Sequence, residues 1–186
     1  GGEGFKPYQP SGMWIALSHP NSDTKNYKMD TDDSIYRRSL YMYWKRTSPH
    51  PMMSLFDAPS RESSCVQRSR TSTSLQSLAL LNETQRLEAS RKLAERLIRH
   101  SRQDTARIHY LFELLTSRKP KSIEIEALSE LLQNSKARYS ENPSDALKLM
   151  EQGLSAVDQN LHSEEVAAWT QVAATMLASD PALLLY

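Results

Sequence analysis

The sequence predicts a mainly α-helical protein, with an irregular N-terminal arm followed by a bundle of about six helices. From position 74 onward, leucines recur at intervals of three, four or six residues, which is typical of amphipathic helices. Proline, asparagine and glycine interrupt this pattern at intervals that suit helix ends. Before position 35 no period is sustained. We therefore divide the chain into an extended arm (1–34), a basic aromatic strap (35–73) and a helical body (74–186), which together form one domain or the C-terminal part of a larger one.

The arm contains two prolines in Lys6-Pro7-Tyr8-Gln9-Pro10, which fix φ and favour extended geometry in the residues before them. An aromatic side chain in such a segment usually docks into a groove, so we expect Tyr8 and Trp14 to anchor the arm on the body of the same protein. Residues 18–33 are polar and rich in turn formers, which predicts a surface loop. The opening Gly1-Gly2-Glu3-Gly4 is read as an interior cut rather than a natural start.

The first part of the strap, residues 36–46, fits two structures. Leu40, Met42 and Trp44 alternate with Tyr41 and Tyr43, as in a strand, although part of the same set also fits one face of a helix. The aromatic residues favour a short strand. Thr47-Ser48-Pro49-His50-Pro51 must then end whichever element precedes it.

The helical body has identifiable starts and stops. We expect helices near 74–82, 83–100, 104–118, 122–139, 143–150 and 163–178, with caps or boundaries at Asn82, Asp104, Ser122, Asn142-Pro143, Gly153, Ser163 and Asp180-Pro181. The last helix carries an apolar face and several alanines, which allow close approach of a neighbouring helix. The basic side of the 83–100 helix, with Arg86, Arg91, Lys92, Arg96 and Arg99, is predicted to be a solvated face.

Charge is distributed unevenly along the chain. Seven basic residues stand against two acidic ones between positions 37 and 70, whereas one lysine stands against seven acidic residues from position 140 onward. We favour the interpretation that the two regions face each other or neighbouring subunits. Binding to nucleic acid usually requires a concentrated basic face and a positive overall balance, and the net charge is only +1.

Few residues have the spacing of a known catalytic or metal-binding motif. The single cysteine, Cys65, excludes an internal disulfide and a covalent Cys-x-x-Cys-His haem attachment. The five histidines lack a partner at metal-site spacing, so we expect no metal site within this chain. Neither a Gly-x-Ser-x-Gly elbow nor a glycine-rich phosphate loop is present, and no apolar run is long enough for a transmembrane helix.

The strap contains the candidate binding residues. Its arginines can hold the chain through ion pairs with Asp57 and Glu62, because guanidinium matches carboxylate geometry. Alternatively, part of the strap lines a cleft for an anionic or sugar-like ligand, and the residues of this candidate site are Arg61, Arg68, Arg70, Tyr41, Tyr43, Trp44 and His50. The purely structural role is favoured, and the catalytic residues are not identified.

Several short motifs, in the order in which they occur along the chain, resemble those of one protein family. They are Tyr36-Arg37-Arg38-Ser39-Leu40-Tyr41, Trp44-Lys45-Arg46-Thr47, Phe56-Asp57-Ala58-Pro59 with Arg61-Glu62, Arg70-Thr71 with Leu75-Gln76, and Leu80-Leu81-Asn82. The family is the planctomycete cytochrome-associated domain of unknown function DUF1553 (PSD1 type). Lys6-Pro7-Tyr8-Gln9-Pro10 and Ala168-Trp169-Thr170 also match, so the resemblance extends over essentially the whole chain. Ser72-Thr73-Ser74, Gln67-Arg68 and Glu83-Thr84 depart from the family pattern, and the longer family domain makes this chain similar to its C-terminal portion.

The resemblance implies an exported, periplasmic or cell-surface protein whose haem, where present, belongs to another part of the full-length molecule, with no cofactor in this chain. The implied partners are the remaining N-terminal part or partner subunits, with polysaccharide as a further candidate and no nucleic acid. Two functions follow. The first is a non-catalytic structural or docking module. The second is part of a redox or polysaccharide-processing enzyme that uses the arginine and aromatic segment as a ligand cleft, so the sequence leaves open whether the protein is an enzyme.

Overall fold

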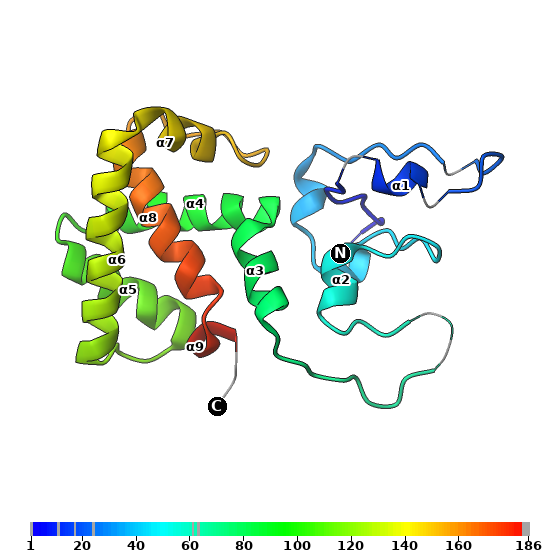
Figure 1. Ribbon diagram of the computed structural model, residues 1–186, viewed down its shortest axis with the longest axis horizontal. Coiled ribbons are helices and arrows are strands. Elements are labelled where there is room, and N and C mark those ends of the chain that lie inside the picture. Colours follow the sequence, from blue (N-terminus) through cyan, green and yellow to red (C-terminus); the bar gives the residue numbers. More distant parts are fainter. Residues whose placement is uncertain are drawn as a thin grey trace. The chain divides into compact units, whose positions relative to one another are not determined.

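The computed structural model describes residues 2–10, 12–16, 18–23, 25–60, 62 and 64–183 (Figure 1). These residues are mainly helical, with an irregular N-terminal region followed by a helical bundle, which confirms the predicted fold class. The chain divides into two compact units, Gly1–Gln76 and Ser77–Tyr186. Each unit is described separately below.

The first unit contains only short helical elements. They are the helices α1 (Met13–Ala16) and α2 (Pro51–Leu55) and the 3₁₀ turns η1 (Asp33–Tyr36) and η2 (Ser39–Tyr41). Pro51 stands at the first position of α2, where its missing N–H has no helical partner to lose. Most of this unit is therefore held by side chains and isolated backbone hydrogen bonds rather than by regular structure.

The arm folds back on the strap within this unit. Phe5 is buried, and its backbone exchanges hydrogen bonds with Tyr41 (2.9 Å) and Tyr43 (2.7 Å). Trp14 is also buried, 4.6 Å from the ring of Tyr27 in the arm and 6.0 Å from that of Tyr43 in the strap, so it anchors the arm within the first unit. Tyr8 was expected to be a second anchor, but its side chain is 40% exposed. Phe5, three residues earlier in the chain, is the second buried aromatic anchor of the arm.

The prediction of a short strand at residues 36–46 is wrong. The backbone forms η1 and η2, and its only β-pairing among the described residues of this segment consists of a bridge from Met42 to Phe5 and another between Lys45 and Ser48. Alternating aromatics favour a pleated surface, but a strand needs a continuous partner. The arm pairs with this segment through one bridge only, so no ladder forms, and Tyr43 packs against Trp14 instead.

The long helices belong to the second unit, apart from α3 (Ser74–Asn82), which crosses the boundary between the units. They are α4 (Thr84–His100), α5 (Asp104–Thr116), α6 (Ser122–Glu141), α7 (Pro143–Met150), α8 (Ser163–Leu177) and the short α9 (Asp180–Leu183). Their bounds agree closely with the prediction, although α9 begins at the Asp180-Pro181 pair that was expected only to end the preceding helix. Asp104, Ser122 and Ser163 are first helical residues rather than N-caps, a shift within the usual uncertainty of helix ends.

Helix α8 forms the centre of the second unit, because α4, α6 and α7 all pack against it (Figure 1). Trp169 is fully buried, as are Val166 and Val172. The alanines at 167, 168 and 173 are also fully buried, so they allow neighbouring helices to approach closely, as expected. The core of this unit therefore follows the apolar pattern of the sequence.

The prediction that the basic face of α4 is exposed to solvent is wrong in part. Arg91 is only 1% exposed, and Glu88 and Glu95 on the same helix are buried with it. The segment between α7 and α8 covers this face, and the guanidinium of Arg91 donates to the backbone carbonyls of Ser155 (2.7 Å) and Ala156 (3.3 Å). Charged side chains are buried here because the groups opposite them are polar backbone atoms rather than apolar side chains.

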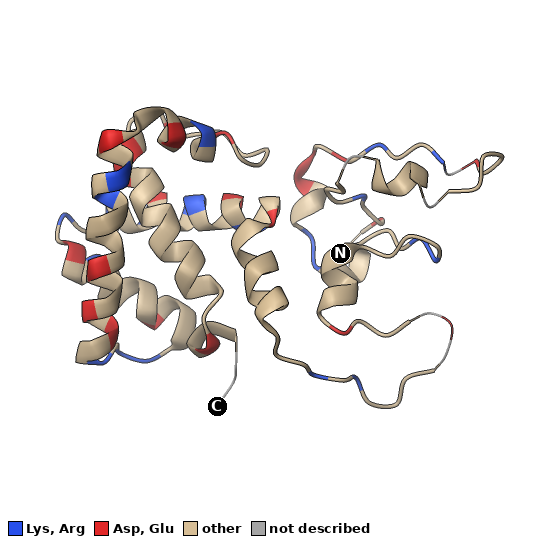
Figure 2. Cartoon of the chain, viewed as in Figure 1, with Lys and Arg blue, Asp and Glu red and all other residues tan. Residues whose placement is uncertain are grey.

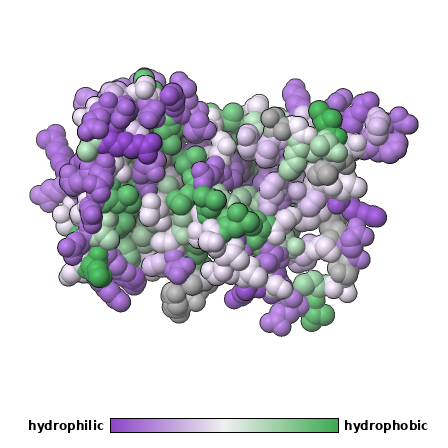
Figure 3. All heavy atoms as spheres, in the orientation of Figure 1, coloured by the Kyte–Doolittle hydropathy of each residue, from purple (hydrophilic) through white to green (hydrophobic). Residues whose placement is uncertain are grey.

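The surface carries both charge signs and scattered apolar residues. Figure 2 shows acidic positions on α7 and on the segment that follows it. Apolar side chains that remain exposed include Leu75 and Leu78 of α3 and Ile123 of α6, and Figure 3 shows apolar atoms interspersed among polar ones on one face. Within the described residues, none of the helices has the length and apolar character needed to span a membrane.

Candidate functional site

A surface hollow lies in the second half of the strap, between the end of α2 and the start of α3. Its volume is about 1040 Å³, and it is lined by Phe56, Asp57, Val66, Gln67, Arg68, Ser69, Arg70, Thr71 and Gln76. Helix α2 ends at Leu55, and the chain turns at Asp57, whose φ of 56° lies in the left-handed region that Asp tolerates better than most residues. This turn directs the following residues around the hollow and back to α3.

A network of hydrogen bonds holds the two ends of this loop together. The carboxylate of Asp57 accepts from the backbone N–H of Thr71 (2.8 Å) and from its hydroxyl (2.7 Å). The side-chain amide of Gln76 donates to the Thr71 hydroxyl oxygen (2.9 Å) and to the carbonyl of Leu55 (2.8 Å). Three side chains thereby join the end of α2 to the beginning of α3.

The same contacts fix the protonation state of Asp57. The hydroxyl of Thr71, then its backbone N–H and the charge of Arg68, hold the pKa of the Asp57 carboxyl below its usual range. A general acid or base works best with a pKa near the working pH. Asp57 is therefore an ionised, hydrogen-bonded anchor at neutral pH rather than a group prepared for proton transfer.

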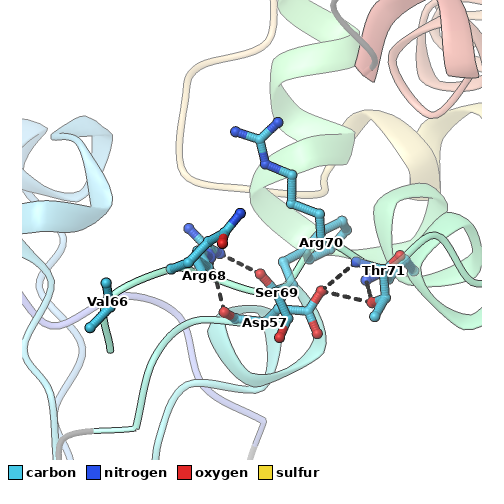
Figure 4. Close-up of a pocket in the computed structure, with 9 residues that line it drawn as sticks. Asp57, Val66, Arg68, Ser69, Arg70 and Thr71 are labelled. Atoms are coloured by element: carbon cyan, nitrogen blue, oxygen red, sulfur yellow. Dashed lines mark hydrogen bonds between the residues drawn. The ribbon is translucent and has the colours of Figure 1, made fainter. Parts of the chain in front are cut away.

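The two described arginines of the hollow behave differently. The side chain of Arg68 donates through Nε to the carbonyl of Asp57 (2.9 Å) and through a terminal nitrogen to the carbonyl of Phe56. Figure 4 shows the side chain of Arg70 extending away from the Asp57 and Thr71 pair. Arg70 is exposed, and no hydrogen bond or ion pair joins it to another described residue. Arg68 closes the loop, whereas Arg70 is available to solvent.

The aromatic candidates lie in another hollow of the same unit. Tyr41, Tyr43 and Trp44 line a depression of about 720 Å³ together with Gly4, Ser39, Leu40, Met42, Met53 and Pro59. Neither Arg68 nor Arg70 contributes to it. The structure therefore brings the three aromatic residues together but separates them from the arginines. Arg61 lies outside the described residues.

His50 belongs to neither hollow. It was expected on an exposed loop between two prolines, but its side chain is only 8% exposed. Its Nε2 lies 3.0 Å from the carbonyl oxygen of Tyr8, which ties the start of α2 to the arm. The prolines on both sides of His50 restrict the backbone as expected, and the arm covers the imidazole.

Sequence reasoning missed Thr71 and Gln76 as parts of this site. A local signal was present, because Thr73-Ser74-Leu75-Gln76 has the spacing of a capping box. The Gln76 backbone N–H lies 3.2 Å from the Thr73 hydroxyl, and the Thr73 backbone N–H donates to the Gln76 side chain (2.9 Å). The long-range contacts of Gln76 with Leu55 and Thr71 have no equivalent signal in the sequence.

The predicted ion pairs of the strap are formed only in part. Arg46 pairs with Glu62 at 2.8 Å, but both side chains are more than half exposed, so the pair contributes little stability. Arg37 instead donates to the carbonyl of Glu3 (2.7 Å). Over the described parts of the chain, no three His, Cys, Asp or Glu side chains come together in a group suited to a metal ion.

Comparison with known proteins assigns the family. A family model described as "PSD1: Protein of unknown function (DUF1553)" matches residues 1–132. The chain belongs to this family. The match includes both hollows of the strap and ends within α6, so Ala168-Trp169-Thr170 lies beyond the matched residues. No curated protein and no solved structure matches the chain.

Proposed function

We propose that this member of the DUF1553 family is a non-catalytic structural or docking module of an exported, cytochrome-associated protein of planctomycete type. The observation that carries the proposal is how the polar side chains of the larger hollow are used. Asp57, Arg68 and Gln76 all bind atoms of the chain itself, and each bond joins segments that are separate in sequence. These contacts stabilise the loop, and this structural role accounts for the three side chains without a substrate.

The remaining parts of the proposal rest on the family resemblance. Proteins of this kind are expected in the periplasm or at the cell surface, with haem bound by a separate module of the full-length protein. The module would then contact the N-terminal part of the same protein or a partner subunit. An uneven distribution of charge, basic in the strap and acidic from position 140 onward, supports an interaction role because charge patches orient partners.

The proposal is tested by comparing Arg68→Ala with Arg70→Ala in the full-length protein. Arg68→Ala should lower the thermal midpoint of the chain slightly, because it removes the hydrogen bonds that join residue 68 to the carbonyls of Phe56 and Asp57 across the loop. Arg70→Ala should leave the midpoint unchanged. Mass spectrometry and absorption spectroscopy of the native full-length protein then establish whether haem, metal or glycan is bound, and any such group should be absent from the chain studied alone.

A second candidate function is a ligand cleft within a redox or polysaccharide-processing enzyme. The exposed guanidinium of Arg70 beside a hollow of about 1040 Å³ favours it, because arginine binds carboxylate and sulfate groups in two-pronged geometry. In titration calorimetry with an acidic polysaccharide, binding that Arg70→Ala abolishes without any loss of thermal stability would support this candidate. Such a result would overturn the purely structural role.

A further inference from the structure

A second pocket lies in the helical unit, between α7, the segment 151–162 and the start of α8. It encloses about 400 Å³ and is lined by Leu147, Met150, Glu151, Val157, Asp158, Gln159, Leu161, His162, Ser163 and Glu164. This volume lies within the range of ordinary binding pockets. The pocket is beyond the residues that the family model matches, and it does not include any residue of the strap.

The irregular wall of this pocket is held by the charged face of α4. The carboxylate of Glu88 accepts from the backbone N–H groups of Leu154 (2.7 Å) and Ser155 (3.1 Å). Arg91 donates to the carbonyl of Ser155 (2.7 Å), and Arg99 pairs with Asp158 further along. An irregular segment with this many fixed backbone groups is a preformed surface rather than a loose connection.

Part of the pocket lining is apolar: Leu147, Met150, Val157 and Leu161 stand beside six polar or charged residues. Met150 is part of the core of the unit and only 3% exposed, and Val157 and Leu161 pack against that core from the loop side. Leu147 sits at the opening and is 55% exposed. An apolar side chain that enters here would bury Leu147 and continue the core outward, which is favourable by the hydrophobic effect.

The rim of the pocket is acidic. Asp158 is neutralised by Arg99, but Glu151 and Glu164 form no ion pair with any described residue. Asp145 on α7 adds a third carboxylate nearby in sequence, although Lys148 pairs with it. The positive end of the α8 dipole offsets part of the charge of Glu164. Two carboxylates without a basic partner remain beside an apolar opening, and no lysine or arginine lines the pocket.

We propose that this pocket docks a basic peptide segment of a partner protein, in which a Leu or Met side chain packs against the apolar part of the lining and flanking Lys or Arg side chains meet Glu151 and Glu164. The proposal rests on the docking role proposed above and gives the chemistry of the partner. A nucleic acid or an anionic membrane would be repelled by the same carboxylates. The volume accommodates one or two side chains, which suits a peptide anchor rather than a large cofactor.

Fluorescence anisotropy with synthetic peptides tests the proposal on the whole 186-residue chain. The probe is a labelled peptide in which Lys or Arg alternates with Leu and Met, and two matched peptides replace either the basic residues by Glu or the apolar ones by Ser. The first peptide should bind, and raising the salt to about 0.5 M should weaken binding roughly tenfold, because screening shortens the reach of surface charges. Both matched peptides should bind at least roughly tenfold more weakly.

Variants locate the binding surface. The double substitution Glu151→Gln and Glu164→Gln should weaken binding by roughly tenfold, and Leu147→Ser by roughly fivefold. Matched controls on α6, outside the pocket, are Glu126→Gln with Glu130→Gln, and Ile123→Ser, an exposed apolar residue; these should leave the affinity unchanged. Far-UV circular dichroism of every variant checks that the fold is retained.

Two results would overturn the proposal. One is equal loss of affinity in the pocket variants and in the α6 controls, and the other is binding of the acidic peptide as tightly as the basic one. Either would leave the structural role of the strap intact, because that role is judged by Arg68→Ala and Arg70→Ala in the first unit. Conversely, catalytic turnover that depends on Arg70 would overturn the non-catalytic role without changing the peptide affinity of this pocket.

Discussion

The substitution Arg91→Met tests whether buried charge holds the segment between α7 and α8. The guanidinium of Arg91 donates to Glu95 (3.1 Å) and to the carbonyls of Ser155 (2.7 Å) and Ala156 (3.3 Å). Methionine retains much of the length of the aliphatic chain, so the substitution removes the charge and the donors without opening a large cavity. The expected loss of stability therefore measures the polar contacts.

The expected loss of stability depends on the buried groups that Arg91→Met leaves without a hydrogen-bond donor. Removing one partner of a buried ion pair usually costs about 3 to 5 kcal/mol, because the remaining charge and acceptors stay buried without compensation. Lys92 still donates to Glu95 (2.9 Å) and to the carbonyl of Ala156 (2.7 Å), which offsets part of the loss. The Nε of Arg91 has no acceptor, which also reduces the net contribution of the arginine. We expect a loss near the lower end, about 3 kcal/mol.

Urea denaturation followed by circular dichroism at 222 nm measures this loss, because the helices from α4 to α8 dominate the helical signal. A loss of about 3 kcal/mol corresponds to a fall of about 6 to 12 °C in the thermal midpoint for a chain of this size. Arg102→Met is the matched control, since Arg102 is exposed, and its effect should stay within about 0.5 kcal/mol. A loss below about 1 kcal/mol for Arg91→Met would refute the reasoning.

Two further substitutions test local geometry and pH dependence. Gly153→Ala should destabilise by about 2 to 4 kcal/mol, because φ at Gly153 is 90° and an added Cβ would lie 2.1 Å from Oε2 of Glu88. Gly12→Ala, at φ 82° with nothing within 4 Å of the new Cβ, should cost only about 1 kcal/mol. If urea denaturation gave the two variants equal losses of stability, a collision between the new Cβ at position 153 and Glu88 would not be the cause. Arg118 lowers the pKa of Glu124 from 4.5 to about 2, so the stability this pair contributes is present above about pH 4.5 and is lost as the pH falls toward about 2. Urea midpoints measured at about pH 7, 4 and 2.5 should therefore fall more steeply for the wild type than for Glu124→Gln. If the midpoints of both proteins fell equally with pH, the Arg118–Glu124 pair would not be the cause of the acid destabilisation.

The helical body could be predicted because its boundaries are encoded locally. A period near 3.6 identifies the apolar face of a helix from the sequence alone, and Asn142-Pro143 marks the start of α7 through the fixed φ of proline. Glu83 was not recognised as a cap, although its carboxylate accepts from the backbone N–H groups of Gln85 and Arg86. Aspartate and asparagine are the usual N-caps, so a glutamate in this role has a weaker signal.

The strap could not be predicted in the same way, because its structure depends on contacts distant in sequence. Whether residues 36–46 form a strand is decided by the arm, which offers Phe5 as a single point of pairing. Whether Arg68 and Arg70 share a cleft with Trp44 is decided by the path of the loop after Asp57. The arginines and aromatics were rightly identified as a dense group, but density along the chain does not establish proximity in space.

The charged face of α4 shows a more general limit of sequence reading. Periodicity assigns charged positions to solvent, since burying an unpaired charge is costly. An irregular segment, however, presents unpaired N–H and C=O groups, and these are matched better by Glu88 and Arg91 than by any apolar side chain. Charged residues can thus be buried wherever a helix must cover irregular backbone instead of another helix.

This arrangement connects the stability of the second unit to its pocket. A regular helix in place of residues 151–162 would satisfy its own backbone and would need no charged partners from α4, but it would also leave no space between α7 and α8. The irregular segment requires Gly153 for its turn and Arg91 for its carbonyls, and it forms one wall of a partly apolar pocket whose rim carries two carboxylates without an ion pair. Burying charges to hold such a segment costs desolvation free energy, and a simple connection between two helices would not require it. The demand is explained if the segment has to present a fixed surface, as docking of a basic peptide would require.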